Sequence, residues 1–181
     1  MRKYLIICAA LSLAGAACAS SQGEQVRDAR MAQTEERAEA NESAVESQAS
    51  AREDAIDKNY DQRAENAAES NRPGADAAEE MVGVSKERAE FQSEAKENLD
   101  KLAVRIDAAH EKIDVLGGKA PTALKGELAT TMQQYKMLQQ DVTNLDETGA
   151  STWESTTDDI DKRIAKLDDR VEDLTEAIND V

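Results

Sequence analysis

The residue types in this sequence that could support catalysis or hold a metal lack the partners that such chemistry needs. The one histidine, His110, has no second histidine or nearby cysteine with which to bind zinc or activate a nucleophile. The run Asp158-Asp159-Ile160-Asp161 lacks the glycine at the sixth place of a calcium loop. Gly117-Gly118-Lys119 lacks the outer glycine and the Ser or Thr of a phosphate loop. We therefore expect no catalytic residue, metal site, cofactor or small-molecule substrate, and we do not expect an enzyme.

Cys18 is the residue with a candidate covalent modification. With Gly15-Ala16-Ala17 it resembles the lipobox at which bacteria attach a lipid to an exported protein, although leucine usually stands where Gly15 does. The alternative is ordinary signal cleavage at the small-x-small sequence Ala17-Cys18-Ala19. Cys8 lies within the preceding apolar stretch and is removed by either route, so the mature chain can form no internal disulfide.

Residues 1–19 have the pattern of a signal peptide. Arg2 and Lys3 supply its positive start, and Leu5 to Ala14 form an apolar stretch too short to span a bilayer. We expect a protein of the bacterial cell envelope that is exported to the periplasm. Lipidation of Cys18 would make it a lipoprotein anchored to a membrane, with the outer membrane as the candidate.

Composition favours long helices over a globular core. Charged residues make up 33% of the chain and aromatic residues 3%, and the net charge is −16. Alanine and long polar residues dominate, which is typical of helical rods, and no strand-like alternation occurs. The acidic surface repels nucleic-acid phosphates, so we expect no nucleic-acid partner.

The C-terminal run from Trp153 carries the clearest heptad seam, meaning a stripe of apolar residues at alternating steps of four and three. Similar stripes occur from about Asp76 to Leu116 and from Pro121 to about Glu147, separated by a Gly-Gly link that favours an antiparallel hairpin. The predicted coiled-coil seam comprises Leu99, Leu102, Ile106, Ile113, Leu116, Leu128, Leu138, Val142, Leu145, Trp153, Ile160, Ile164, Leu167, Val171, Leu174 and Ile178.

Two points in this helical body stay open from the sequence. Near residues 147–151 the seam slips by one residue, so the chain either turns or bends there, and Ser151 with Glu154 could form a capping box. The last seam packs either inside the monomer or against a second chain, where Arg163 would face Asp168 of the partner.

Residues 20–74 have few apolar side chains larger than alanine, and Pro73 marks a boundary at their end. We expect a solvated or fraying helical spacer between anchor and body, because an unpacked helix is marginal in water. The predicted domains are thus a signal (1–19), a polar spacer (20–74) and a coiled-coil body (75–181). The predicted fold is all-α: an elongated antiparallel hairpin or three-helix coiled coil with an extended N-terminal helix.

The segment from about Ala89 to Ile178 resembles a group of small bacterial coiled-coil envelope proteins, some linked to stress responses and many of them uncharacterised lipoproteins. The likeness rests on Leu99-x-x-Leu102-x-x-x-Ile106, on the glycine link, and on Ser151-Thr152-Trp153-Glu154 opening a charged helix. It implies a non-enzymatic structural or interaction protein, with self-association or another helical protein as partner. The alternative is an apolipoprotein-like protein whose amphipathic helices bind lipid.

Overall fold

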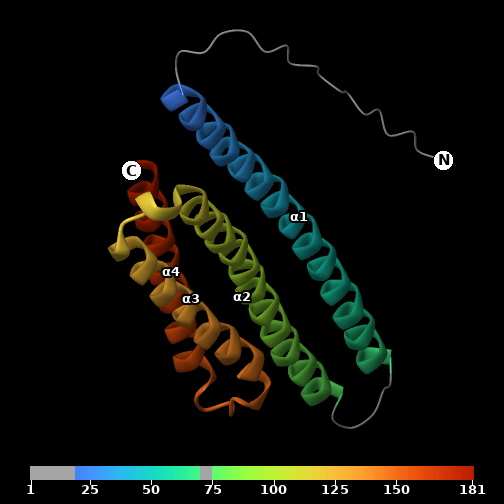
Figure 1. The fold of residues 1–181 in the computed structure, drawn as a ribbon. Helices are drawn as coiled ribbons and strands as arrows, with labels where there is room; N and C mark the ends of the chain where they lie inside the picture. The colour runs from blue at the N-terminus through green and yellow to red at the C-terminus, as the bar shows by residue number, and fades with distance from the viewer. Residues whose placement is uncertain (1–18, 70–74) are drawn as a thin grey trace, which may run out of the picture.

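The protein is an all-α helical bundle in the computed structural model, which describes residues 19–69 and 75–181 (Figure 1). No strand occurs within these two ranges. The helices, in chain order, are α1 (Ala19–Glu69), α2 (Ala75–Leu116), the 3₁₀ turn η1 (Gly117–Lys119), α3 (Thr122–Thr143), the 3₁₀ turn η2 (Asn144–Glu147) and α4 (Trp153–Asn179).

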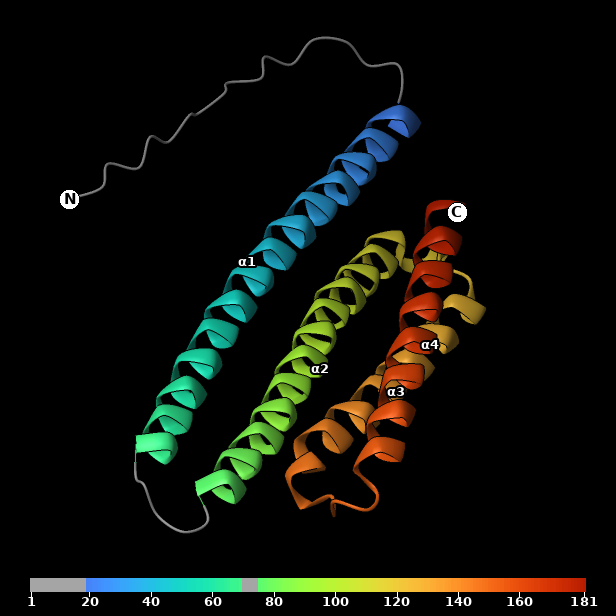
Figure 2. The ribbon, with the colours of Figure 1, turned by 180° about the vertical axis from the view of Figure 1, so that it is seen from behind.

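Successive helices run in opposite directions, so the bundle is long and narrow (Figures 1 and 2). Helix α2 is the central element, because it packs against α1, α3 and α4. Helices α3 and α4 also pack against each other, and α1 lies along α2 on the outside of this three-helix body. The N-terminal end of α1 and the C-terminus lie at the same end of the bundle.

The apolar core lies between α2, α3 and α4. The structure places all residues of the predicted seam there as buried side chains, with the exception of Trp153, which is partly buried and packs against the cluster. Val171 is fully buried, and Leu145, Ile160, Leu174 and Ile178 are each 1% exposed. Alternating steps of three and four residues thus bring one side of each helix to a common axis.

The glycine link between α2 and α3 reverses the chain as the sequence indicates. Gly117 has φ +58, in the left-handed region that favours glycine, and its carbonyl accepts a hydrogen bond from the N–H of Ala120 at 3.3 Å. Pro121 is the N-cap of α3, one residue before the first helical position where the sequence predicts it.

The chain turns rather than bends between α3 and α4. Helix α3 ends at Thr143, η2 follows, and α4 begins at Trp153 and runs back along α3. The capping box that Ser151 and Glu154 could form does not occur: Thr152 is the N-cap, and its side chain makes no cap hydrogen bond. The Thr152 hydroxyl instead donates to the carbonyl of Gly149 at 3.1 Å, which tightens the turn before the helix.

The prediction of a loosely solvated spacer is wrong for the first helix. Helix α1 is continuous from Ala19 to Glu69 and folds back along α2, with Ala49 2% exposed and Thr34 8% exposed. It spans roughly 77 Å at 1.5 Å per residue, but most of that length lies beside α2. The predicted boundary at Pro73 and the signal peptide lie outside the described residues, except that Ala19, the last residue assigned to the signal, begins α1.

Candidate functional site

A stripe on α1 meets α2 along the whole hairpin, and its period differs from the heptad. Its positions follow steps of three, four and four, which repeat every eleven residues and stay close to the 3.6-residue period of a straight helix. One position of this pattern, Glu53, is exposed and is not part of the stripe. All residues of the stripe are half-buried or buried, and most are small or polar. The stripe consists of Met31, Thr34, Ala38, Glu42, Val45, Ala49, Ile56, Tyr60, Ala64 and Ala67.

Carboxylates that flank this stripe pair with lysines on α2. Glu35, Glu46 and Asp57 follow one another at intervals of eleven residues on α1. Glu46 accepts from Lys101 at 3.3 Å, and Asp57 accepts from Lys86 at 2.8 Å. The heptad pattern does not predict this row of ion pairs, because the carboxylates recur every eleven residues and not every seven. The eleven-residue recurrence of carboxylates is the signal that reveals it.

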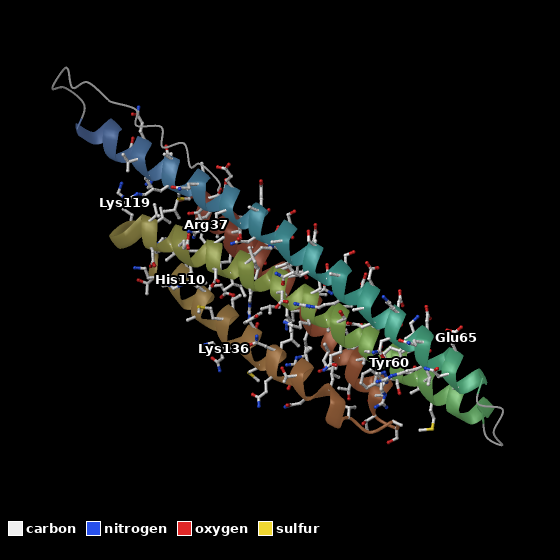
Figure 3. All side chains as sticks on the ribbon, turned by 90° about the vertical axis from the view of Figure 1, so that its right-hand side faces the viewer. Arg37, Tyr60, Glu65, His110, Lys119 and Lys136 are labelled. Atoms are coloured by element: carbon white, nitrogen blue, oxygen red, sulfur yellow. The ribbon has the colours of Figure 1, made fainter. Side chains whose placement is uncertain are left out.

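Lys112 ties three helices together. It lies on α2 and is 3% exposed, and its ammonium group donates to Glu35 of α1 and, at 3.2 Å, to the Asn179 side chain of α4. An ammonium group that is removed from water needs such partners, because an unpaired buried charge costs several kcal/mol. Arg37 of α1, which is labelled in Figure 3 and is exposed, pairs with Glu111 of α2.

Charges on α4 pair within the chain. Arg163 bonds Asp141 of α3 at 2.6 Å and Asp159 at 3.2 Å. Asp168 pairs with Arg105 of α2. In the dimer considered from the sequence, Arg163 would pair with Asp168 of a second chain. In the structure, each of these two residues instead forms an ion pair with a neighbouring helix of the same chain. The apolar seam of α4 is likewise buried inside the monomer.

These contacts shift several side-chain pKa values. The pKa of Lys86 is raised above 10.5 chiefly by its hydrogen bond to Asp57. The pKa of Lys101 is raised by its hydrogen bond to Glu97 and, after that, by its hydrogen bond to Glu46, against the lowering effect of burial. Burial raises the pKa of the Tyr135 phenol above 10.0, with help from the charge of Asp100. The two lysines are therefore more firmly charged in the folded state, and the phenol more firmly neutral.

Trp153 closes the end of the bundle opposite the C-terminus. Its ring meets Phe91 of α2 edge to face, with 6.0 Å between centroids, and the Arg88 guanidinium lies 4.5 Å from the Trp153 ring. Arg88 also donates to the carbonyl of Thr148 at 3.4 Å. This arrangement fastens the α3–α4 turn to the start of α2, which is a packing role for the only tryptophan.

The residues considered for catalysis lie on the surface. His110 is exposed and its Nε2 lies 3.8 Å from Asp114. Asp158 and Asp159 are exposed residues within α4, where each faces a cation one turn later. Across residues 19–69 and 75–181, no group of three or more His, Cys, Asp or Glu side chains is placed to hold a metal ion. Cys18, the predicted lipidation site, lies outside the described residues.

The first turns of α1 project beyond the rest of the bundle. Met31 packs against the core, and the first turns of α1 extend past the end of α2 (Figures 1 and 2). Residues 23–30 are exposed apart from the half-buried Arg27, and Val26 is 54% exposed. Residues 19–30 span roughly 18 Å, so α1 begins as a short stalk directly after Cys18.

Comparison with known proteins found no relative: no family model, no curated protein and no solved structure matches the chain. In the described part of the chain, none of the helices has the length and apolar character needed to cross a bilayer.

Proposed function

We propose that the protein is a non-enzymatic helical lipoprotein of the bacterial envelope, tethered through Cys18 in the periplasm, that serves as a structural or interaction rod. The resemblance of the sequence to small coiled-coil envelope lipoproteins supports this, including a link to stress responses. The heptad seams also support the proposal, because most of the large apolar side chains pack the helices against one another along their length.

The observation that carries the proposal is the position of the stalk. A helix that begins at Ala19, immediately after the candidate lipid attachment site, projects past the end of the bundle. A lipid on Cys18 would therefore hold the bundle end-on, with its long charged sides free for another helical protein or for a second copy. Helices of this length present a wide lateral surface for such contacts, and the net charge of −16 favours a partner with basic character.

The test is intact-mass spectrometry of the mature protein recovered from bacterial membranes. We expect a chain that begins at Cys18 and carries a diacylglyceryl group and an acyl group. The matched control is Cys18→Ser, which should lose the lipid mass and move the protein to the soluble periplasmic fraction. A mature chain that begins at Ser20 without lipid would refute the tether, although the helical rod would remain.

A further inference from the structure

Two sides of α1 are hollowed, and the two sides differ in charge. On the side of α4, two adjoining grooves of about 490 and 400 Å³ run along α1 and α2. On the side of α3, a groove of about 650 Å³ lies between α1, α2 and α3. All three are long surface depressions between helices, and each has the size of a small-molecule site.

The grooves beside α4 are walled by carboxylates. Their linings include Glu39 and Glu42 of α1 and Glu172 and Glu176 of α4, opposed by Arg105 and Lys112 of α2. Each of these two cations already bonds an acidic or amide side chain of a neighbouring helix. An anion entering this side would meet repulsion from both walls.

The groove beside α3 carries an excess of positive charge. Arg52 of α1 and Lys96 of α2 both reach the same oxygen of Asp100, at 3.5 and 3.1 Å. Asp100 is the sole carboxylate among the described residues that line this groove. Lys96 also donates to the second oxygen of Asp100, at 3.2 Å. Two cations thus share one anion, and four N–H donors of Arg52 and one of Lys96 remain available to a further acceptor.

Next to these cations the groove has an apolar surface. Leu99 and Val142, both buried in the core, form part of its lining, and Ile56 and Ala89 lie half-buried along it. Ala55, which is exposed, lies at its rim on α1. A cationic end and an apolar trough within one groove match a ligand with an anionic head and an aliphatic tail.

We propose that this groove, between α1, α2 and α3, binds a single-chain amphiphile with an anionic headgroup, such as a fatty carboxylate, with the head at Arg52 and Lys96. The acidic surface as a whole repels anions. Among the described residues, one other groove has cations and no carboxylate in its lining, between α3 and α4, but it is smaller, at about 280 Å³, and its Arg163 already pairs with Asp141 and Asp159. The folded protein binds the ligand without opening its helices, which goes beyond the proposed structural role and does not depend on the lipid at Cys18.

Isothermal titration of the protein with laurate, below the concentration at which laurate forms micelles, tests the site. We expect one laurate per chain, and binding at least tenfold weaker for dodecyltrimethylammonium, which has the same tail and the opposite charge. Decanoate, which is two methylenes shorter, should bind about fifteenfold more weakly than laurate, since each methylene that leaves the groove weakens binding roughly fourfold. Equal or tighter binding of the cationic amphiphile, or no uptake of laurate before micelles form, overturns the proposal.

Matched variants locate the site. Arg52→Glu with Lys96→Glu should weaken laurate binding at least tenfold, whereas Lys136→Glu with Lys162→Glu makes the same change in net charge at exposed positions outside the groove and should alter it less than twofold. Because reversing Arg52 also disturbs the α1–α2 contact, Ala55→Trp supplies a second approach, since an indole there fills the trough from its exposed rim. Ala51→Trp, one turn earlier and also exposed, is its control. Equal binding by each variant and its control overturns the site.

Flotation with phosphatidylglycerol vesicles separates a free amphiphile from a lipid surface. The Cys18→Ser protein should bind free laurate and remain at the bottom of the gradient. Flotation that persists in Arg52→Glu with Lys96→Glu, together with absent laurate binding, would show a membrane-surface interaction in place of the groove. A negative result for laurate binding does not affect the mass measurement on Cys18, so the groove proposal and the lipid-tether proposal can fail separately.

Discussion

Helix α2 has two packed sides that are built on different principles. Toward α3 and α4 it presents large aliphatic side chains at heptad positions. Three of them, Leu99, Leu102 and Ile106, are each 3% exposed. Toward α1 it presents lysines and small residues that meet an eleven-residue stripe of alanines, polar groups and a few apolar side chains. Burying large apolar side chains contributes about 1.5–3 kcal/mol each, while an exposed ion pair contributes about 0–1 kcal/mol.

This difference indicates that the three-helix body holds most of the stability and that α1 is the more easily released element. Alanine buries little area, so close approach of two backbones replaces interdigitated side chains in the α1–α2 contact. Lys112 is the exception, because it joins α1 to α4 as well as to α2. The predictions below test whether the two sides of α2 respond separately.

The largest effect should come from the heptad side. Leu167→Asp places an unpaired charge at a position that is 2% exposed and should lower the free energy of unfolding by about 2–4 kcal/mol. Urea unfolding followed by circular dichroism measures it. Lys162→Asp, at an exposed position of the same helix, should change the free energy by less than about 0.5 kcal/mol. An unchanged midpoint for Leu167→Asp would mean that the α4 seam faces water.

An intermediate effect should come from the α1 side. Ala49→Leu adds bulk at a position that is 2% exposed between α1 and α2, and should weaken the docking of α1 by about 1–3 kcal/mol. Hydrogen exchange should then speed up between residues 31 and 67 and remain unchanged in α4. The control is Ala51→Leu, which is exposed. Equal acceleration in α4 would show that the two sides of α2 unfold as one unit.

The smallest effect should appear at alkaline pH. The pKa values of Lys86 and Lys101 are raised on folding, so their contribution is fully present below pH 10.5 and is lost as the pH rises through their raised folded values. The phenol of Tyr135, whose pKa is also raised, adds a loss in the body above pH 10.0 and is removed by Tyr135→Phe. In that background we expect α1 to loosen first.

Spin labels at exposed positions report that loosening in a Cys18→Ser background. The distance between Ser50 on α1 and Gln140 on α3 should broaden between pH 9 and pH 12, while the distance between Gln140 and Lys162 on α4 stays narrow. Simultaneous broadening of both distances would contradict a weaker α1 contact.

The three-helix body was predictable because its seams use large aliphatic residues. Leu138, Val142 and Leu145 mark one side of α3 without ambiguity, and Gly117 marks the reversal before that helix. The direction of the chain after Thr143 was not predictable, because a slip of one residue fits both a bend and a turn. The contacts of Trp153 with Phe91 and Arg88 favour the turn, and they join segments that are distant in the sequence.

The packing of α1 against α2 was not predicted, because alanine distinguishes poorly between a solvated helix and a packed one. Ala38 and Ala49 are compatible with a solvated helix and with a close helix contact, and only the lysines of a distant segment decide between them. The burial of Lys112 depends on the convergence of α1, α2 and α4, so no local pattern reveals it. The groove beside α3 likewise arises from three helices whose side chains leave it unfilled.

The even number of antiparallel helices has a practical consequence. The C-terminus lies at the same end of the bundle as the stalk of α1 (Figure 1), so a fluorescent tag added after Val181 would report on the surroundings of the proposed attachment point. The opposite tip, formed by the α3–α4 turn and the first turns of α2, stands farthest from that point. Met81, 71% exposed, and Val84, 48% exposed, lie near this tip, which makes it the place to introduce a photocrosslinker in a search for binding partners.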